Sequence, residues 1–206
     1  MKKLMAWRIC AIGILALAAC VPASEEEIVS RGSQAAPNEV RVSGKAPSGA
    51  GSERRFTAYL TGYTYWDNTP PGSAAIARPV IHRRAGGIGT YDDPVTLAVG
   101  HKIVGGRQTL DYPAGTRFYI PNLRRYAIVE DVCGDGPRPQ NGPCHTGHRG
   151  HPWLDIYLDG RRVGDAASQR CAYRITGLQP VFINPRPGYP VDRGPISESG
   201  CGVYPS

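Results

Sequence analysis

The sequence predicts a mainly β domain, a small barrel or sandwich, over residues 55–206. This stretch holds about 150 residues, the length of one ordinary domain. Short runs rich in β-branched and aromatic residues recur through it, and turns containing Gly or Pro separate them. No segment keeps an apolar period of about 3.6 residues over three turns, so long amphipathic helices are not expected. Many short strands between such turns are typical of barrels and sandwiches.

The runs define the expected strands, which are Phe56–Tyr65, Val80–His82, Val95–Val99, Arg117–Ile120, Tyr126–Val132, Leu154–Leu158 and Val181–Asn184. Turn signals such as Pro113-Ala114-Gly115 and Asp159-Gly160 lie between them. Asp165–Arg170 is the best helix candidate, because an acidic residue near the start of a helix interacts favourably with the helix dipole.

The first twenty residues predict export and a lipid anchor. Met1–Arg8 is short and basic, and Ile9–Ala19 is an apolar run of about 11 residues, shorter than the roughly 20 that a membrane-spanning helix needs. Leu17-Ala18-Ala19-Cys20 resembles the lipobox of bacterial lipoproteins, in which cleavage leaves a lipidated cysteine. Cys20 would then hold the protein to a membrane. The alternative is an ordinary secretory signal with an incidental cysteine.

Residues 20–54 are predicted to form a flexible tether that carries the lipid. They are rich in Ser, Ala, Gly, Pro and Glu and contain almost no large apolar group, so they cannot bury enough surface to offset their ordering entropy. Loss of residues 1–19 lowers the formal charge from +7 to +4, because that segment has three basic residues and no acidic one. This mild charge, without a Lys/Arg run, argues against a nucleic-acid partner.

Four cysteines remain after Cys10 and Cys20, namely Cys133, Cys144, Cys171 and Cys201. An even number of cysteines in an oxidising compartment predicts two disulfides. Three pairings are possible, and the sequence does not choose among them. A zinc site is the rival interpretation, but the chain contains no Cys-x-x-Cys pair.

The segment Tyr126–Gly134 carries the first candidate for chemistry. As a strand, it places Ala127, Val129, Asp131 and Cys133 on one face and Ile128, Glu130 and Val132 on the other. An acid at the end of an apolar strand, before a Gly-rich loop, is placed for partial burial to raise its pKa. A general acid that works near neutral pH requires this. The alternative is that the two acids cap the following turn.

A second acid, Asp155, lies in the segment Trp153–Leu158. Strand alternation puts it on the same face as Trp153 and Tyr157. An acid between aromatic rings suits sugar binding, because rings stack on pyranose faces and carboxylates accept hydrogen bonds from hydroxyl groups. A structural aspartate that fixes a neighbouring loop is the alternative.

Aromatic residues line one face of the first expected strand, where Tyr59, Tyr63 and Tyr65 share parity and Trp66 and Asp67 follow. These residues belong either to the core or to the wall of a groove. A separate segment, His145-x-x-His148-x-x-His151, has a spacing that allows metal ligation. Its setting among Gly, Arg and Pro favours a polar loop, so neither a metal nor a cofactor is expected.

Together these segments resemble the double-psi β-barrels of the rare lipoprotein A-like kind, relatives of barwin and expansin domains and of the three-Asp domain of lytic transglycosylases. The likeness is carried by Ala114–Ile120 as the Gly-Thr strand, Val129–Pro137 as the strand-ending Asp with its Gly-Pro loop, and Leu154–Tyr157 as the later strand around an Asp. Asp67–Ser73, Pro79–His82 and Gly86–Thr96 resemble a secreted, cysteine-containing branch. The resemblance covers roughly residues 56–175.

The resemblance implies a six-stranded double-psi β-barrel with short helices, long Gly/Pro-rich loops and a polysaccharide groove across one face. Asp131 corresponds to the catalytic acid of the lytic transglycosylase members, and Asp155 would position substrate or support Asp131. The family's Glu and His before the Gly-Thr strand are not in register here, and His101 is the candidate replacement. The candidate substrate contacts are Tyr63, Tyr65, Trp66, Asp67, Asp92, His101, Trp153 and Tyr157.

The sequence therefore predicts a cell-envelope lipoprotein that acts on peptidoglycan or a related wall polysaccharide by lytic transglycosylase-like cleavage. A non-catalytic, expansin-like carbohydrate-binding or wall-loosening module is the alternative, and a structural or inhibitor-like envelope domain is a third. A monomer is expected. In a Gram-negative host it would lie on the outer membrane facing the periplasm, because Val21 is not the Asp that retains lipoproteins at the inner membrane.

Overall fold

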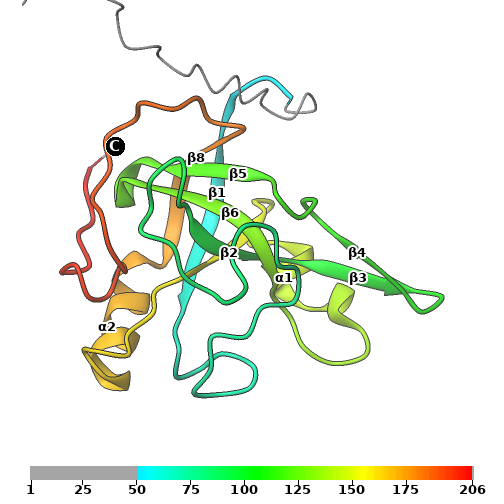
Figure 1. Cartoon of the computed structure of the whole chain (residues 1–206). Helices are drawn as coiled ribbons and strands as arrows, with labels where there is room; N and C mark the ends of the chain where they lie inside the picture. Colours follow the sequence, from blue (N-terminus) through cyan, green and yellow to red (C-terminus); the bar gives the residue numbers. More distant parts are fainter. Residues whose placement is uncertain (1–50, 206) are drawn as a thin grey trace, which may run out of the picture. The chain divides into compact units, whose positions relative to one another are not determined.

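Six strands close into a barrel at the centre of the domain (Figure 1). The fold is that of a computed structural model, which describes residues 51–205. The strands in order around the barrel are β1 (Arg54–Tyr63), β7 (Trp153–Tyr157), β2 (Val95–Val99), β6 (Arg125–Val132), β5 (Arg117–Ile120) and β8 (Gly177–Ile183). β8 pairs with β1 and closes the barrel. The predicted mainly β fold with a closed six-stranded barrel is confirmed.

The barrel combines parallel and antiparallel pairs. β1 runs parallel to β7, and β2 runs parallel to β6. The other neighbouring pairs are antiparallel. Because β7 lies between β1 and β2, strands from distant parts of the chain share one surface.

Alternation along each strand separates an inward set of side chains from an outward set. The inward set includes Leu60, Leu97, Val129, Leu154 and Ile156, none of which has exposed surface. Thr61, Ala98 and Asp155 occupy the intervening positions and therefore face outward. The barrel interior is an apolar core, and the polar residues of interest lie on its outer face.

Val80–His82 does not form the predicted strand. These residues lie in a loop between β1 and β2 that contains bends. Their backbone N–H groups donate to the side chain of Glu130 instead of to a neighbouring strand. The carboxylate supplies the acceptors that a strand would otherwise need, so tertiary contacts override the strand propensity of Val80 and Ile81.

A hairpin outside the barrel was not predicted. β3 (His101–Val104) and β4 (Arg107–Leu110) pair with each other and project from the barrel (Figure 1). Gly105 and Gly106 form the turn with φ values of 57° and 76°, which residues with a side chain rarely adopt. The two strands are short and carry several polar residues, so they give no apolar alternation in the sequence.

The helices are short, and the longest is α2 (Asp165–Ile175). It extends beyond the predicted Asp165–Arg170 because Cys171, Ala172 and Ile175 are buried and tie its last turns to the core. The remaining helical turns are η1 (Pro121–Leu123), η2 (Pro139–Asn141) and α1 (Pro143–Thr146).

Two disulfides join the four predicted cysteines, and the structure fixes their pairing. Cys133 bonds to Cys144, and Cys171 bonds to Cys201; the Cα atoms are 5.7 Å apart in each pair. The first disulfide ties the segment after β6 to α1, and the second ties α2 to the C-terminal segment.

The predicted signal peptide, Cys20 and nearly all of the predicted tether lie outside the described residues. Within residues 51–205, no helix has the length and apolar character that crossing a membrane requires.

Candidate functional site

A pocket of about 380 Å³ opens on the outer face of the barrel, where β1, β7, β2 and β6 lie in succession. Among the predicted site residues, Tyr63, Asp67, Asp131 and Asp155 line this pocket. Loop residues between β1 and β2 and the segment after Asp131 complete its walls.

The strand register places Asp131 and Asp155 on opposite sides of Ala98. Ala98 on β2 is paired with Asp131 on β6 and with Asp155 on β7. Because adjacent strands are about 4.8 Å apart, the two aspartate backbones are separated by about 10 Å. The Ala98 side chain is a single methyl group, and Ala98 itself lines the pocket. The space between the two carboxyl groups is therefore open to a ligand.

A β-bulge aims Asp131 at this space. Leu97 pairs with Val129, but the next residue, Ala98, pairs with Asp131, so Glu130 is the extra residue of β6. Asp131 therefore shares a face with Ala98, whereas strict alternation placed it with Val129. That part of the face assignment was wrong, because sequence alternation does not reveal a bulge.

The Asp131 carboxyl group is held by three hydrogen bonds. Its Oδ1 accepts from the backbone N–H groups of Ala77 at 3.0 Å and Val132 at 2.9 Å, and its Oδ2 accepts from the Tyr63 hydroxyl at 3.0 Å. Burial raises the pKa of Asp131 and outweighs these hydrogen bonds, which lower it; the charge of Glu130 raises it further. Asp131 therefore keeps its proton to a higher pH than an ordinary aspartate.

Asp155 belongs to a short relay of side chains. The Trp153 Nε1–H donates to Thr61 Oγ1 at 2.8 Å, and the Thr61 hydroxyl donates to Asp155 Oδ1 at 2.6 Å. Burial of the carboxyl group raises the pKa of Asp155 to about 7, aided by the charges of Asp67 and Asp131, while the Thr61 hydrogen bond lowers it. A carboxyl group with this pKa can both donate and accept a proton at neutral pH.

Asp67 lies at the rim of the pocket and is fixed by its neighbours. Its Oδ1 accepts from the backbone N–H and the hydroxyl of Thr64 at 2.6 and 2.8 Å, and its Oδ2 accepts from the Gln169 side chain at 2.9 Å. The exposed carboxylate adds negative charge beside Asp155. This charge favours the protonated form of the Asp155 carboxyl group.

The other predicted aromatic contacts are not in the pocket lining. The Trp66 Nε1–H donates to the carbonyl of Gly160 at 3.1 Å, and the Tyr65 ring packs edge-on against Trp66. Tyr157 is buried with its ring 5.2 Å from that of Tyr63. Trp153 packs on Tyr59, which stacks in turn on His148. This last cluster is partly exposed and lies next to the Thr61–Asp155 pair along β1 and β7.

The remaining polar candidates lie apart from the pocket lining. His101 is buried at the start of β3, and burial lowers its pKa. Asp92 is exposed in the loop before β2. His145 contacts Asp111 at 2.6 Å, and the backbones of His148 and His151 form a bridge. Among residues 51–205, no His, Cys, Asp and Glu side chains are grouped as a metal site would require.

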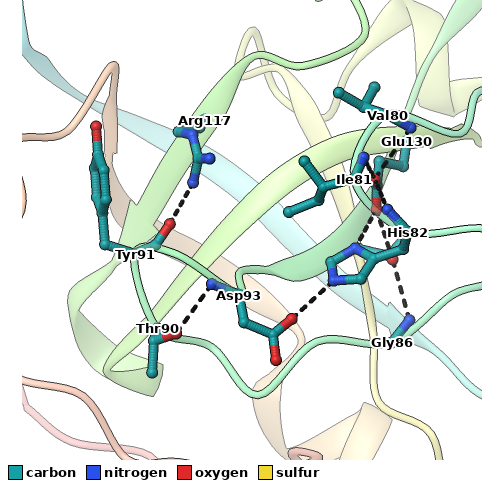
Figure 2. A network of polar contacts seen from close by, with 10 residues as sticks. Val80, Ile81, His82, Gly86, Thr90, Tyr91, Asp93, Arg117 and Glu130 are labelled. Carbon is teal, nitrogen blue, oxygen red and sulfur yellow. Dashed lines mark hydrogen bonds and ion pairs between the residues drawn. The ribbon is translucent and has the colours of Figure 1, made fainter. Parts of the chain in front are cut away.

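Sequence reasoning missed a polar cluster built around Glu130, the residue before Asp131. Figure 2 shows the His82 ring between the carboxylates of Glu130 and Asp93. We refer to His82, Glu130 and Asp93 as the His82 clasp. Glu130 has no exposed surface, and the His82 and Asp93 side chains are 18% and 43% exposed. The sequence separations of 48 and 11 residues gave no signal for it, because one sequence does not show which distant polar residues meet.

The family model of the DDB_G0273701 N-terminal domain matches residues 55–202. The chain belongs to this family. It is similar to an uncharacterized protein of Dictyostelium discoideum, DDB_G0273701/DDB_G0273221, with 39% identity over 144 residues, which are 68% of this chain and 56% of the relative. The chain thus spans little more than half the length of that curated relative. No solved structure matches the chain significantly. Apart from Arg54 at the start of β1, the barrel, the pocket and the His82 clasp lie within the residues that the family model matches.

Proposed function

We propose that the protein cleaves a wall polysaccharide of the peptidoglycan type, with the pocket carboxyl groups transferring the proton. The observation that carries this proposal is the pair Asp131 and Asp155. Both have a raised pKa, and they flank the small residue Ala98 in one open pocket. Environments that raise the pKa of a carboxyl group in a cleft are typical of general acids.

The proposed reaction is lytic transglycosylation. Asp131 donates its proton to the glycosidic oxygen as the bond from that oxygen to C1 breaks. The 6-hydroxyl oxygen of the muramic acid then bonds to C1, and its proton returns to Asp131, so no water is consumed. One carboxyl group serves both steps. Asp155 supports it from the other side of Ala98 as a second group that exchanges protons near neutral pH.

The closed six-stranded barrel is compatible with the double-psi β-barrel of rare lipoprotein A-like proteins, and we include that finer assignment in the proposal. The partly exposed aromatic cluster of Tyr59, His148 and Trp153 beside Asp155 offers rings on which further sugar units could stack. The relative from Dictyostelium discoideum does not indicate a bacterial envelope. The proposed location on a membrane therefore rests on residues 1–20, with a lipid on Cys20.

The test incubates the full-length protein with purified sacculi and identifies released products by mass spectrometry. We expect anhydro-muropeptides from the wild type and none from Asp131→Asn. Asp155→Asn should lower the yield, and the matched control Asp92→Asn, an exposed residue apart from the pocket lining, should not. Co-sedimentation with sacculi without released product would contradict cleavage and support the non-catalytic binding module.

A further inference from the structure

Both ring nitrogens of His82 face a carboxylate oxygen. Nδ1 lies 2.6 Å from Glu130 Oε2, and Nε2 lies 2.8 Å from Asp93 Oδ1 (Figure 2). An ionised carboxylate only accepts hydrogen bonds, and a neutral imidazole donates from one nitrogen alone. Only the imidazolium form donates to both partners. The geometry of the clasp therefore matches protonated His82.

Glu130 depends on this clasp because its side chain has no exposed surface. Its Oε1 accepts from the backbone N–H groups of Val80, Ile81 and His82 at 3.2, 2.7 and 2.8 Å. Its Oε2 accepts from the Thr96 hydroxyl at 3.2 Å in addition to the His82 ring. Among these donors, the His82 ring is the one that can carry a positive charge. It offsets the cost of burying the carboxylate.

The clasp fixes a segment that forms one wall of the pocket. Ala75, Ile76 and Ala77 line the pocket, and the Ala77 N–H donates to Asp131 Oδ1. The next N–H, that of Arg78, donates to the backbone carbonyl of Glu130 at 2.8 Å. The three N–H groups of residues 80–82 then bind the Glu130 carboxylate. Residues 75–82 are thus attached to β6 at two adjacent acids, one in the pocket and one in the clasp.

We infer that His82 is a protonation-dependent positioning residue, which as an imidazolium holds residues 75–82 against β6 and so keeps the Ala77 N–H on Asp131. The effect on cleavage rests on the proposed function, whereas the clasp itself does not. His82 does not touch the pocket and acts on Asp131 through the backbone of the wall segment.

Loss of the proton breaks one contact before the other. Asp93 is 43% exposed, so water can replace His82 as its partner, but Glu130 is fully buried and has no such substitute. Neutral His82 therefore keeps its proton on Nδ1 and continues to donate to Glu130. Its Nε2 then presents a lone pair to Asp93, and that contact is lost. The loop that carries Asp93 no longer restrains the His82 ring, and residues 75–82 are held less firmly.

The groups around His82 favour its protonated form. Burial lowers the pKa of His82, but hydrogen bonds to Asp93 and Glu130 and the negative charges of both raise it above the ordinary value of 6.5. Asp93 from the loop before β2 and Glu130 from β6 are the charged groups that face the ring. Arg83 and Arg84 follow it in the chain and are exposed. The clasp therefore opens as the pH rises through the pKa of His82, which lies above 6.5.

The test follows His82 and the wall segment in the full-length protein from about pH 5.5 to 8.5, the range in which histidines titrate. Nitrogen-15 NMR of the ring should show a pKa above that of free histidine and a neutral form with the proton on Nδ1. Hydrogen exchange of the amides of Ala77, Arg78, Val80, Ile81 and His82, corrected for the intrinsic pH dependence, should accelerate at least about tenfold through the same titration. A proton on Nε2 in the neutral form, or unchanged protection across the titration, would overturn the inference.

Asp93→Asn is the most informative variant. The asparagine amide can donate to a neutral Nε2, so the second contact no longer requires the imidazolium. The pKa of His82 should fall, and protection of residues 77–82 should become independent of pH over the tested range. The matched control is His145→Gln, which removes a single His–Asp contact on α1 and should leave the pH dependence intact. If amide protection in Asp93→Asn depended on pH as it does in the wild type, the clasp would be contradicted. This test does not require the direct variant His82→Gln to fold.

The two proposals fail separately. If exchange follows the His82 titration but sacculi yield no anhydro product at any pH, the proposed function is wrong and the clasp stands. If product forms while exchange stays flat, the clasp alone is wrong. If both proposals hold, the cleavage rate of Asp93→Asn should begin to decline at a higher pH than the cleavage rate of the wild type.

Discussion

Glu130 and Asp131 are neighbours on β6, yet they occupy opposite environments. Glu130 is fully buried, and its carboxylate accepts hydrogen bonds from Val80, Ile81, His82 and Thr96. Asp131 accepts three hydrogen bonds and lies at an open pocket with Ala98 and Asp155. The bulge in β6 makes this possible, because it lets two consecutive acids leave the same strand without pointing into the core.

On β6, Glu130 therefore has a structural role, and its neighbour Asp131 is available for chemistry in the pocket. The Glu130 carboxylate is surrounded by hydrogen-bond donors and by the positive charge of protonated His82, so it contributes to the stability of the fold. The Asp131 carboxyl group is desolvated without an opposite charge beside it, so its pKa is raised and it keeps its proton to a higher pH. The following substitutions act on one of these environments and leave the other unchanged.

Glu130→Ala should have the largest effect on stability. It leaves the His82 ring and three backbone N–H groups without their acceptor, so the free energy of unfolding should fall by about 3–5 kcal/mol. Asp131→Asn keeps an acceptor for Ala77 and Val132 and should change this free energy by less than about 1 kcal/mol. Urea titration of the two variants measures both values, and equal losses would remove the distinction between the two acids.

Ala98→Leu should close the space between Asp131 and Asp155. The added side chain would occupy the floor of the pocket, so release of anhydro product should fall at least about 100-fold. The His82 titration should not change, because the clasp does not involve Ala98. Cleavage at the wild-type rate in a folded Ala98→Leu variant would show that the reaction occurs elsewhere.

The pH dependence of stability should separate the two regions. The pKa of Asp155 is raised from 3.8 to about 7, so the folded protein binds this proton more tightly than the unfolded chain, and stability should fall as the pH rises between these values. His82 also has a raised pKa, so its contribution is complete below 6.5 and is lost as the pH rises through the folded pKa.

Urea titrations across this range should show that Asp155→Asn reduces the loss of stability between pH 3.8 and about 7, with the part due to Asp131 remaining, and that His82→Gln removes the loss through the His82 pKa. If both variants lost stability with rising pH as the wild type does, other titrating groups would be responsible for the loss.

Thr61→Val should have the smallest effect. It removes the hydroxyl that donates to Asp155 and keeps a similar volume, so the pKa of Asp155 should rise further, by about one pH unit or less. The upper limit of the pH profile of cleavage should shift by the same amount in the alkaline direction. A shift in the acidic direction would contradict the assigned role of the hydroxyl group.

The sequence predicted the parts of the molecule that depend on local pattern. Val95–Val99 and Arg117–Ile120 are strands at the predicted residues, because they are rich in β-branched and aromatic residues and turn residues bound them. Alternation also placed Asp155 on the same face of β7 as Trp153, and the structure shows that this is the outer face. The presence of two disulfides followed from the number of cysteines, but their pairing did not.

Features that depend on distant contacts were not predictable. The bulge at Glu130 reverses the face of Asp131, and nothing in the local pattern signals it. Val80–His82 has strand propensity, but the carboxylate of Glu130, 48 residues from His82, accepts its N–H groups. Asp92 and Asp93 are adjacent and equally acidic, yet Asp93 contacts His82 and Asp92 is exposed. Only the fold distinguishes them.

The protonation of the pocket carboxyl groups is the property on which the account depends, and it can be measured without knowing the polysaccharide. Carbon-13 NMR of aspartate carboxyl groups in the full-length protein, assigned with Asp131→Asn and Asp155→Asn, gives each titration directly. We expect Asp155 to titrate near pH 7 and Asp131 above the ordinary value of 3.8. Titration of both groups at or below 3.8 would contradict the account, since neither could then serve as an acid at neutral pH.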